Sequence, residues 1–149
     1  MKKLISPVAL ALVLALTGCG AASTAPTGPA PSTAAKETPQ VPELTGAWRQ
    51  SNPNSEDAYQ QATITADTIT VEWVADGGDT TSIYWVGTFA APTDANEPHT
   101  WTSKRDAAAT DSALMASTSD TKEFTYEGDT ISYKVSALGT TTTVKLKKN

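Results

Sequence analysis

The chain of 149 residues contains one cysteine, Cys19, and one histidine, His99. This excludes an intramolecular disulfide and a zinc site built from several thiolate or imidazole ligands. Lysine and arginine together number 11 against 16 aspartates and glutamates, and no basic cluster lies outside the last few residues. A surface of this charge repels nucleic acid, so we expect no nucleic-acid partner.

The main apolar run, from Leu4 to Leu16, follows Lys2 and Lys3 and ends just before Cys19. Its length is typical of the apolar region of a secretory signal and too short to span a bilayer comfortably. No second apolar stretch of spanning length follows it in the sequence. We therefore expect residues 1–18 to be a signal peptide.

The residues at the end of this run, Leu16-Thr17-Gly18-Cys19, resemble the lipobox of bacterial lipoproteins. The resemblance implies that the leader is cut before Cys19, whose thiol then carries a diacylglycerol. Because two acyl chains suffice for stable anchoring, it implies a protein held on the extracytoplasmic face of the cell membrane. The alternative is an ordinary signal peptide with a chance cysteine near its cleavage site. Loss of Lys2 and Lys3 leaves 9 basic against 16 acidic residues, a net charge of −7.

Residues 19–42 have a different composition, dominated by Ala, Ser, Thr, Gly and Pro, with no aromatic residue. Such a segment buries too little apolar surface to offset its ordering entropy. We expect a disordered tether, which at about 3.1 Å per residue reaches on the order of 70 Å when extended.

Residues 43–149 form a segment of about a hundred residues, enough for one domain and too short for two. Apolar and polar residues alternate through it with a period of two, as in strands with one solvated face. This pattern predicts about eight strands, joined mostly by tight turns such as those at Asp76–Asp79 and Glu127–Asp129. The expected strands lie near 44–50, 60–66, 68–75, 81–90, 98–104, 121–127, 129–137 and 140–147.

The strand expected at 81–90 and the segment 105–120 need separate treatment. In 81–90, alternation places Ile83 and Trp85 on one face and Tyr84 on the other. Segment 105–120 stays open between a helical turn at Ala107–Ala109 or Ala113–Ala116 and a short strand holding Leu114 and Ala116.

The run of tight hairpins predicts an all-β fold, an antiparallel up-and-down barrel, with a β-sandwich as the alternative. Gly46-Ala47-Trp48, at the start of the first strand, resembles the lipocalin signature. That resemblance implies a lipocalin-like barrel whose base is closed by Trp48 under a basic side chain from the last strand, here Lys145 or Lys147. The arginine usual in the family is missing. The domain as a whole also resembles small uncharacterised lipoproteins of Gram-positive bacteria and their phages.

The candidate pocket or core residues are aromatic, because a barrel of this size holds either a filled core or one small ligand. We expect them to serve mainly as core, with Trp48 at the base and Trp101 or Tyr133 lining an opening. The set comprises Trp48, Trp73, Trp85, Trp101 and Tyr133.

No catalytic, metal-binding or cofactor-binding residue is predicted. His99 has no serine or acidic partner at a family-like spacing. The acidic and amide groups around Asn52–Asp57 and Asp76–Asp79 are typical of turns and match no calcium-loop spacing.

We therefore expect a surface-tethered binding module, not an enzyme, whose partner is a protein, a glycan or a small apolar ligand. Two alternatives remain: an envelope-structural lipoprotein of the superinfection-exclusion type, without a cargo pocket, and a secreted enzyme. A barrel packed solid by its aromatic residues would exclude a lipocalin-style cargo role.

Overall fold

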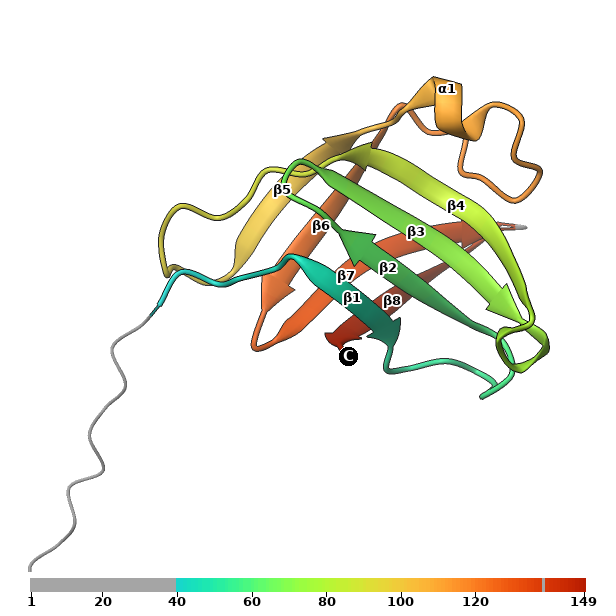
Figure 1. The fold of residues 1–149 in the computed structure, drawn as a ribbon, viewed down its shortest axis with the longest axis horizontal. Coiled ribbons are helices and arrows are strands. Elements are labelled where there is room, and N and C mark those ends of the chain that lie inside the picture. Colours follow the sequence, from blue (N-terminus) through green and yellow to red (C-terminus); the bar gives the residue numbers. More distant parts are fainter. Residues whose placement is uncertain (1–39, 138) are drawn as a thin grey trace, which may run out of the picture. The chain divides into compact units, whose positions relative to one another are not determined.

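The computed structural model describes residues 40–137 and 139–149 (Figure 1). The predicted signal peptide, Cys19 and nearly all of the predicted tether lie outside the described residues. In the described part, no helix has the length and hydrophobicity needed to cross a membrane.

Eight strands follow one another along the chain, and each lies within two residues of its predicted bounds. One helical turn, η1 (Asp76–Gly78), joins the third and fourth strands, and one short helix, α1 (Ala107–Thr110), follows the fifth. Leu114 and Ala116 lie in turns, so segment 105–120 contains the helical turn and no strand. The strands are β1 (Gly46–Gln50), β2 (Tyr59–Ile64), β3 (Thr68–Ala75), β4 (Thr80–Thr88), β5 (His99–Lys104), β6 (Thr121–Glu127), β7 (Thr130–Ala137) and β8 (Thr140–Lys148).

The strands form one antiparallel sheet in the order β4-β3-β2-β1-β8-β7-β6-β5. The first and last strands of the chain are paired, with Trp48 opposite Lys148. This up-and-down order confirms the predicted all-β barrel and not the β-sandwich (Figure 1). The two ends of the sheet, β4 and β5, meet at a single bridge between Gly87 and Arg105, so the barrel is nearly closed.

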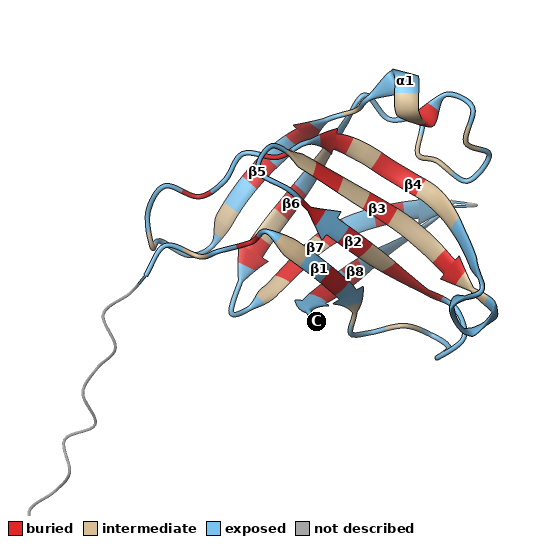
Figure 2. Ribbon diagram, viewed as in Figure 1, coloured by how far each residue is buried: buried red, intermediate tan, exposed pale blue. Residues whose placement is uncertain are grey.

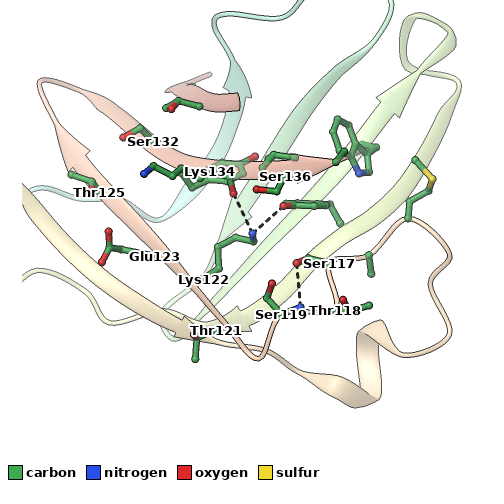
Figure 3. A pocket seen from close by; sticks show the side chains of 18 of the residues that line it. Ser117, Thr118, Ser119, Thr121, Lys122, Glu123, Thr125, Ser132, Lys134 and Ser136 are labelled. Carbon is green, nitrogen blue, oxygen red and sulfur yellow. Dashed lines mark hydrogen bonds between the residues drawn. The ribbon is translucent and has the colours of Figure 1, made fainter. Parts of the chain in front are cut away.

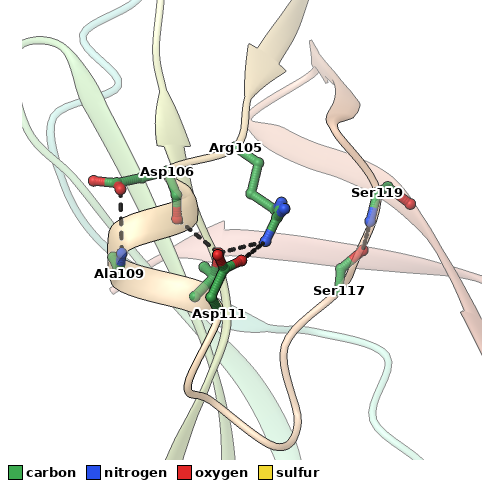
Figure 4. Close-up of polar contacts among 7 residues, drawn as sticks. Arg105, Asp106, Ala109, Asp111, Ser117 and Ser119 are labelled. Carbon is green, nitrogen blue, oxygen red and sulfur yellow. Dashed lines mark hydrogen bonds and ion pairs between the residues drawn. The ribbon is translucent and has the colours of Figure 1, made fainter.

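The segment after β5 covers the free edge of β4. The backbone N–H of Asp106 donates to the carbonyl of Val86 at 2.8 Å, and that of Ser117 donates to the carbonyl of Tyr84 at 2.8 Å. Asp106 also caps α1, and Arg105 forms an ion pair of 2.6 Å with Asp111 (Figure 4). The two backbone hydrogen bonds satisfy carbonyl groups that an open edge of β4 would leave unpaired.

A β-bulge in β4 changes which aromatic residues face the interior. Val71 lies opposite Trp85, whereas Glu72 lies opposite Ile83, so Tyr84 is the extra residue. A bulge shifts the alternation by one position, and both Tyr84 and Trp85 therefore point inward. The expectation that Tyr84 faces away from Trp85 was wrong for this reason: Tyr84 is 6% exposed and packs in the core.

Buried positions alternate with more exposed ones along the strands (Figure 2). The buried side chains form one core that is rich in aromatic rings. Trp101 packs between Phe89 and Phe124, with ring centroids 5.2 and 5.4 Å away. Phe124 continues to Tyr133 at 5.0 Å, and Tyr133 stacks on Tyr84 at 6.4 Å. The middle of the barrel is therefore occupied by the protein's own side chains.

Gly87 allows the barrel to close, so Gly87→Ala should open the seam. A Cβ there would lie 2.5 Å from the carbonyl oxygen of Lys104 and 2.5 Å from the Ser103 hydroxyl. Because both neighbours are held in the wall, we expect a loss of about 1–3 kcal/mol in the free energy of unfolding. Urea denaturation measures it. Thr81→Ala, an exposed change on the same strand, is the control, and equal stability of the two variants would contradict this role of Gly87.

Candidate functional site

Trp48 closes one end of the barrel. Its indole Nε1 donates to the carbonyl of Leu44 at 2.9 Å, and its ring lies edge-on to Tyr126 at 6.4 Å. The basic residue over the ring is Lys148, whose Nζ is 5.9 Å from the ring centroid. The expectation that Lys145 or Lys147 fills this place was wrong. Alternation along β8 places both on the outer face, whereas Lys148 lies on the same face as Leu146 and directly opposite Trp48.

A groove of about 840 Å³ lies beside this closed end. Its polar groups bind one another: Lys148 Nζ donates to the carbonyl of Glu43 at 2.7 Å, and the hydroxyl of Tyr126 donates to Asp129 at 3.1 Å. Glu97 accepts the backbone N–H of Gly128 at 2.8 Å. This groove therefore offers few free groups to a ligand.

The opposite end of the barrel has a gap in its wall. The ladder between β6 and β7 stops at Phe124 and Tyr133. On either side the neighbouring ladders continue, as far as Thr121 for β5–β6 and Ala137 for β7–β8. The two strands thus diverge beyond Phe124, and the gap between them opens into a pocket of about 660 Å³ (Figure 3).

Lys122 stands in this opening, which we call the β6–β7 pocket. Its ammonium donates to the Tyr84 hydroxyl at 2.9 Å and to the carbonyl of Lys134 at 3.3 Å (Figure 3). It lies 4.9 Å from the ring centroid of Tyr84. The sole ion pair in the described ranges is Arg105–Asp111, so the Lys122 ammonium has no carboxylate partner there. Burial lowers the pKa of Lys122 from its usual value.

The pocket wall combines aromatic rings with hydroxyl groups. Half-buried Trp73 packs edge-on against Tyr84 at 5.4 Å, and Tyr133 adds a third ring. The loop after α1 lies along one side and carries the exposed side chains of Leu114 and Met115. The hydroxyl-bearing lining residues are Ser117, Thr118, Ser119, Thr121, Thr125, Ser132, Ser136 and Thr143.

Below the pocket, Tyr133 is fixed by a buried hydrogen bond from its hydroxyl to Oε1 of Gln60. Gln60 is fully buried, and its Nε2 has no hydrogen-bond partner. Burial raises the pKa of Tyr133 well above its ordinary value, because a phenolate there would lose its hydration. The ring of Tyr133 in the pocket wall is thus held by a buried hydrogen bond within an apolar core.

The five aromatic residues singled out from the sequence fall into different places. Trp85 and Trp101 are core, and Trp101 lines neither the pocket nor the groove. Trp48 belongs to the closed end, whereas Trp73 and Tyr133 line the β6–β7 pocket. Sequence reasoning missed Lys122, although alternation along 121–127 places it on the same face as Phe124 and Tyr126.

The remaining polar candidates are structural. His99 stacks on Trp101 with ring centroids 5.7 Å apart, and its Nε2 lies 3.3 Å from the carbonyl of Ala90. Among residues 40–137 and 139–149, no three His, Cys, Asp or Glu side chains are grouped to hold a metal ion. The acidic groups near Asp57 and Asp76 lie in turns linked by the bond from Gly77 N–H to the carbonyl of Asp57.

No protein-family model matches the chain, and comparisons with curated proteins and with solved structures give no match.

Tyr133→Phe should destabilise the domain by about 1–3 kcal/mol at pH 7, because it leaves Gln60 with an unpaired buried carbonyl. A raised tyrosine pKa contributes stability below the unfolded value of about 10, and this is lost as the pH rises through the folded value. Burial raises the pKa of Tyr84 as well. The wild type should therefore lose stability above about pH 10, and Tyr133→Phe should lose less. Urea denaturation at pH 7 and above about pH 10 measures how much stability each protein loses. Equal losses in the wild type and in Tyr133→Phe would contradict this expectation.

Proposed function

We propose that the chain is a bacterial lipoprotein, anchored through a diacylglycerol on Cys19 to the extracytoplasmic face of the cell membrane. Its β-barrel domain serves as a binding module at the end of a flexible tether. The anchoring part rests on the apolar leader and on Leu16-Thr17-Gly18-Cys19. The acidic balance of the rest of the chain suits a domain that stays in water beside the membrane.

The binding part rests on one observation, the Lys122 ammonium without a carboxylate partner inside the β6–β7 pocket. A half-buried cation is unfavourable unless something compensates the lost hydration. A carbonyl and a phenol hydroxyl supply only part of that compensation. An anionic or strongly accepting group of a ligand supplies the rest, and a pocket of about 660 Å³ admits a small molecule.

The lining favours a hydroxyl-rich ligand over an apolar one. Aromatic rings fill the barrel centre, which leaves a lipocalin-style cargo no space there. At the pocket, Trp73 and Tyr84 offer ring surface, and the serine and threonine hydroxyls offer hydrogen bonds. This combination suits a short glycan with an acidic group: a sugar ring packs on the aromatic residues and its carboxylate meets Lys122.

The proposed role is binding, because the Lys122 ammonium is held in the pocket by the Tyr84 hydroxyl and the carbonyl of Lys134 and can pair with an acidic group there. The filled interior also supports a second candidate, an envelope-structural lipoprotein whose pocket takes no ligand. The following experiment separates the two.

Lys122→Met should abolish most binding of an acidic glycan. We expect a disaccharide with one glucuronic acid unit, which carries a single carboxylate, to bind the full chain and a neutral disaccharide of glucose to bind much more weakly. Losing a hydrogen bond to a charged group should weaken binding by about 10–100-fold. Isothermal titration calorimetry measures the affinities.

Lys104→Met, an exposed lysine outside the pocket, is the matched control and should bind like the wild type. Lys122→Met should melt at or above the wild-type temperature, since it removes a partly desolvated charge. No binding by the folded wild type would favour the structural candidate. Equal binding by both variants would contradict a role of Lys122 in binding the glycan.

Cys19→Ala should release the protein from the membrane into the medium or the soluble extracytoplasmic fraction. Cell fractionation with immunoblotting measures the distribution, and mass spectrometry of the native protein should find a diacylglycerol on an N-terminal Cys19. A Ser23→Ala change in the expected tether is the control and should stay with the membrane. Native protein with an uncleaved leader and a free thiol would overturn the anchoring proposal.

A further inference from the structure

Strand pairing gathers four cations on the outer face of the barrel, although the sequence disperses them. Arg49 on β1 lies opposite Lys147 on β8, and Lys145 follows two positions earlier on β8. Lys134 on β7 is diagonal to Lys145, because Ser132 pairs with Lys145 and Lys134 with Thr143. All four side chains are exposed, and we call them the basic row.

Standard sheet geometry gives the spacing within this row. Residues directly opposite each other lie about 5 Å apart, and diagonal neighbours about 7–8 Å. Two positions along a strand span about 7 Å. The four cations therefore form a continuous line about 20 Å long, with one charge at roughly every 5–8 Å.

This arrangement is unfavourable for the folded chain alone, because like charges directly opposite each other on a sheet destabilise it. The described residues hold one ion pair, Arg105–Asp111, so none of the four cations is paired with a carboxylate there. Arg49 is held by the ring of Tyr59, with its guanidinium carbon 3.9 Å from the ring centroid. The guanidinium N–H groups remain exposed at one end of the row.

The basic row is narrow. On one side, Glu72 on β3 accepts a hydrogen bond from Gln61 at 3.0 Å. On the other side, β6 turns Glu123 and Glu127 outward, and Glu127 lies opposite Thr130. Carboxylates thus flank a line of positive charge that is three strands wide.

We propose that the basic row binds a linear polyanion, a polymer with regularly spaced phosphate or carboxylate groups. A single chain fits a line of four cations and avoids the flanking carboxylates. A broad anionic surface, such as a membrane of acidic lipids, would contact the four cations and also the flanking carboxylates, which repel it. Edge protection does not explain the lysines, because β1, β8 and β7 are each paired on both sides.

The test is the salt dependence of binding to the full chain, with inorganic polyphosphate as the probe. If four cations each displace a counterion, the logarithm of the association constant should fall with the logarithm of salt concentration with a slope of about −3. Polygalacturonate is the second probe, and the tighter binder of the two identifies phosphate or carboxylate as the preferred charge. Vesicles of phosphatidylglycerol and phosphatidylcholine are the third probe. They are tested with the Cys19→Ala chain, which cannot carry the proposed lipid, and should bind weakly.

Lys145→Gln and Lys147→Gln should each weaken polyanion binding and make the slope shallower by about one. Lys104→Gln removes the same charge elsewhere on the barrel and should change neither the affinity for the polyanion nor the slope of its salt dependence. Lys147→Gln should also raise the melting temperature at low salt, because it relieves repulsion with Arg49. Lys122→Met should leave polyphosphate binding unchanged. Lys134 lines the β6–β7 pocket as well, whereas Lys145 and Lys147 do not, so the two β8 variants test this proposal apart from the pocket.

Three results would overturn the proposal. The first is no binding of either polymer at low salt by the folded chain. The second is an equal loss of binding for Lys104→Gln and Lys147→Gln, which indicates nonspecific attraction. The third is vesicle binding as tight as polymer binding and equally dependent on Lys147, which indicates a membrane surface.

Discussion

The structure depends on burying large aromatic rings inside a barrel of only eight strands. The β-bulge in β4 adds one more ring than regular alternation allows, because it turns Tyr84 inward beside Trp85. Tyr84 stacks on Tyr133, the last residue of β7 paired with β6. The extra ring therefore lies at the level where the wall opens, and it forms part of the lining of the β6–β7 pocket.

At each end of the aromatic core, a lysine ammonium lies near an aromatic ring. Lys148 lies over Trp48 at the closed end, and Lys122 lies over Tyr84 at the open end. The two differ in their surroundings: Lys148 donates to a carbonyl of the chain that crosses the base, whereas Lys122 faces a pocket lined by hydroxyl groups. The same residue type thus donates to the chain's own backbone at one end and, among the described residues, has no carboxylate partner at the other.

Most of the fold could be predicted, because a period of two with glycine-rich turns is a strong local signal for strands and hairpins. The exceptions have different causes. Tyr84 was assigned to the wrong face because a bulge is a property of two paired strands, and the sequence of one strand does not reveal it. Lys145 and Lys147 were preferred over Lys148 by analogy with a family motif, against the alternation that correctly places Leu146 and Lys148 on the same face. Of the residues that line the β6–β7 pocket, the sequence predicts Trp73 and Tyr133 as candidates but not Lys122.

The sequence by itself determined where the strands run and, apart from the bulge, which side chains face the core, because both follow from neighbours within a few residues. It also carries the whole case for a lipid anchor, in Leu16-Thr17-Gly18-Cys19. Only the tertiary structure decided where the β6–β7 ladder ends and that Arg49 stands beside Lys147. Arg49 meets Lys147 because the first and last strands of the chain pair, and the β6–β7 ladder ends where each of these two neighbouring strands stays paired only with its other partner, β5 or β8.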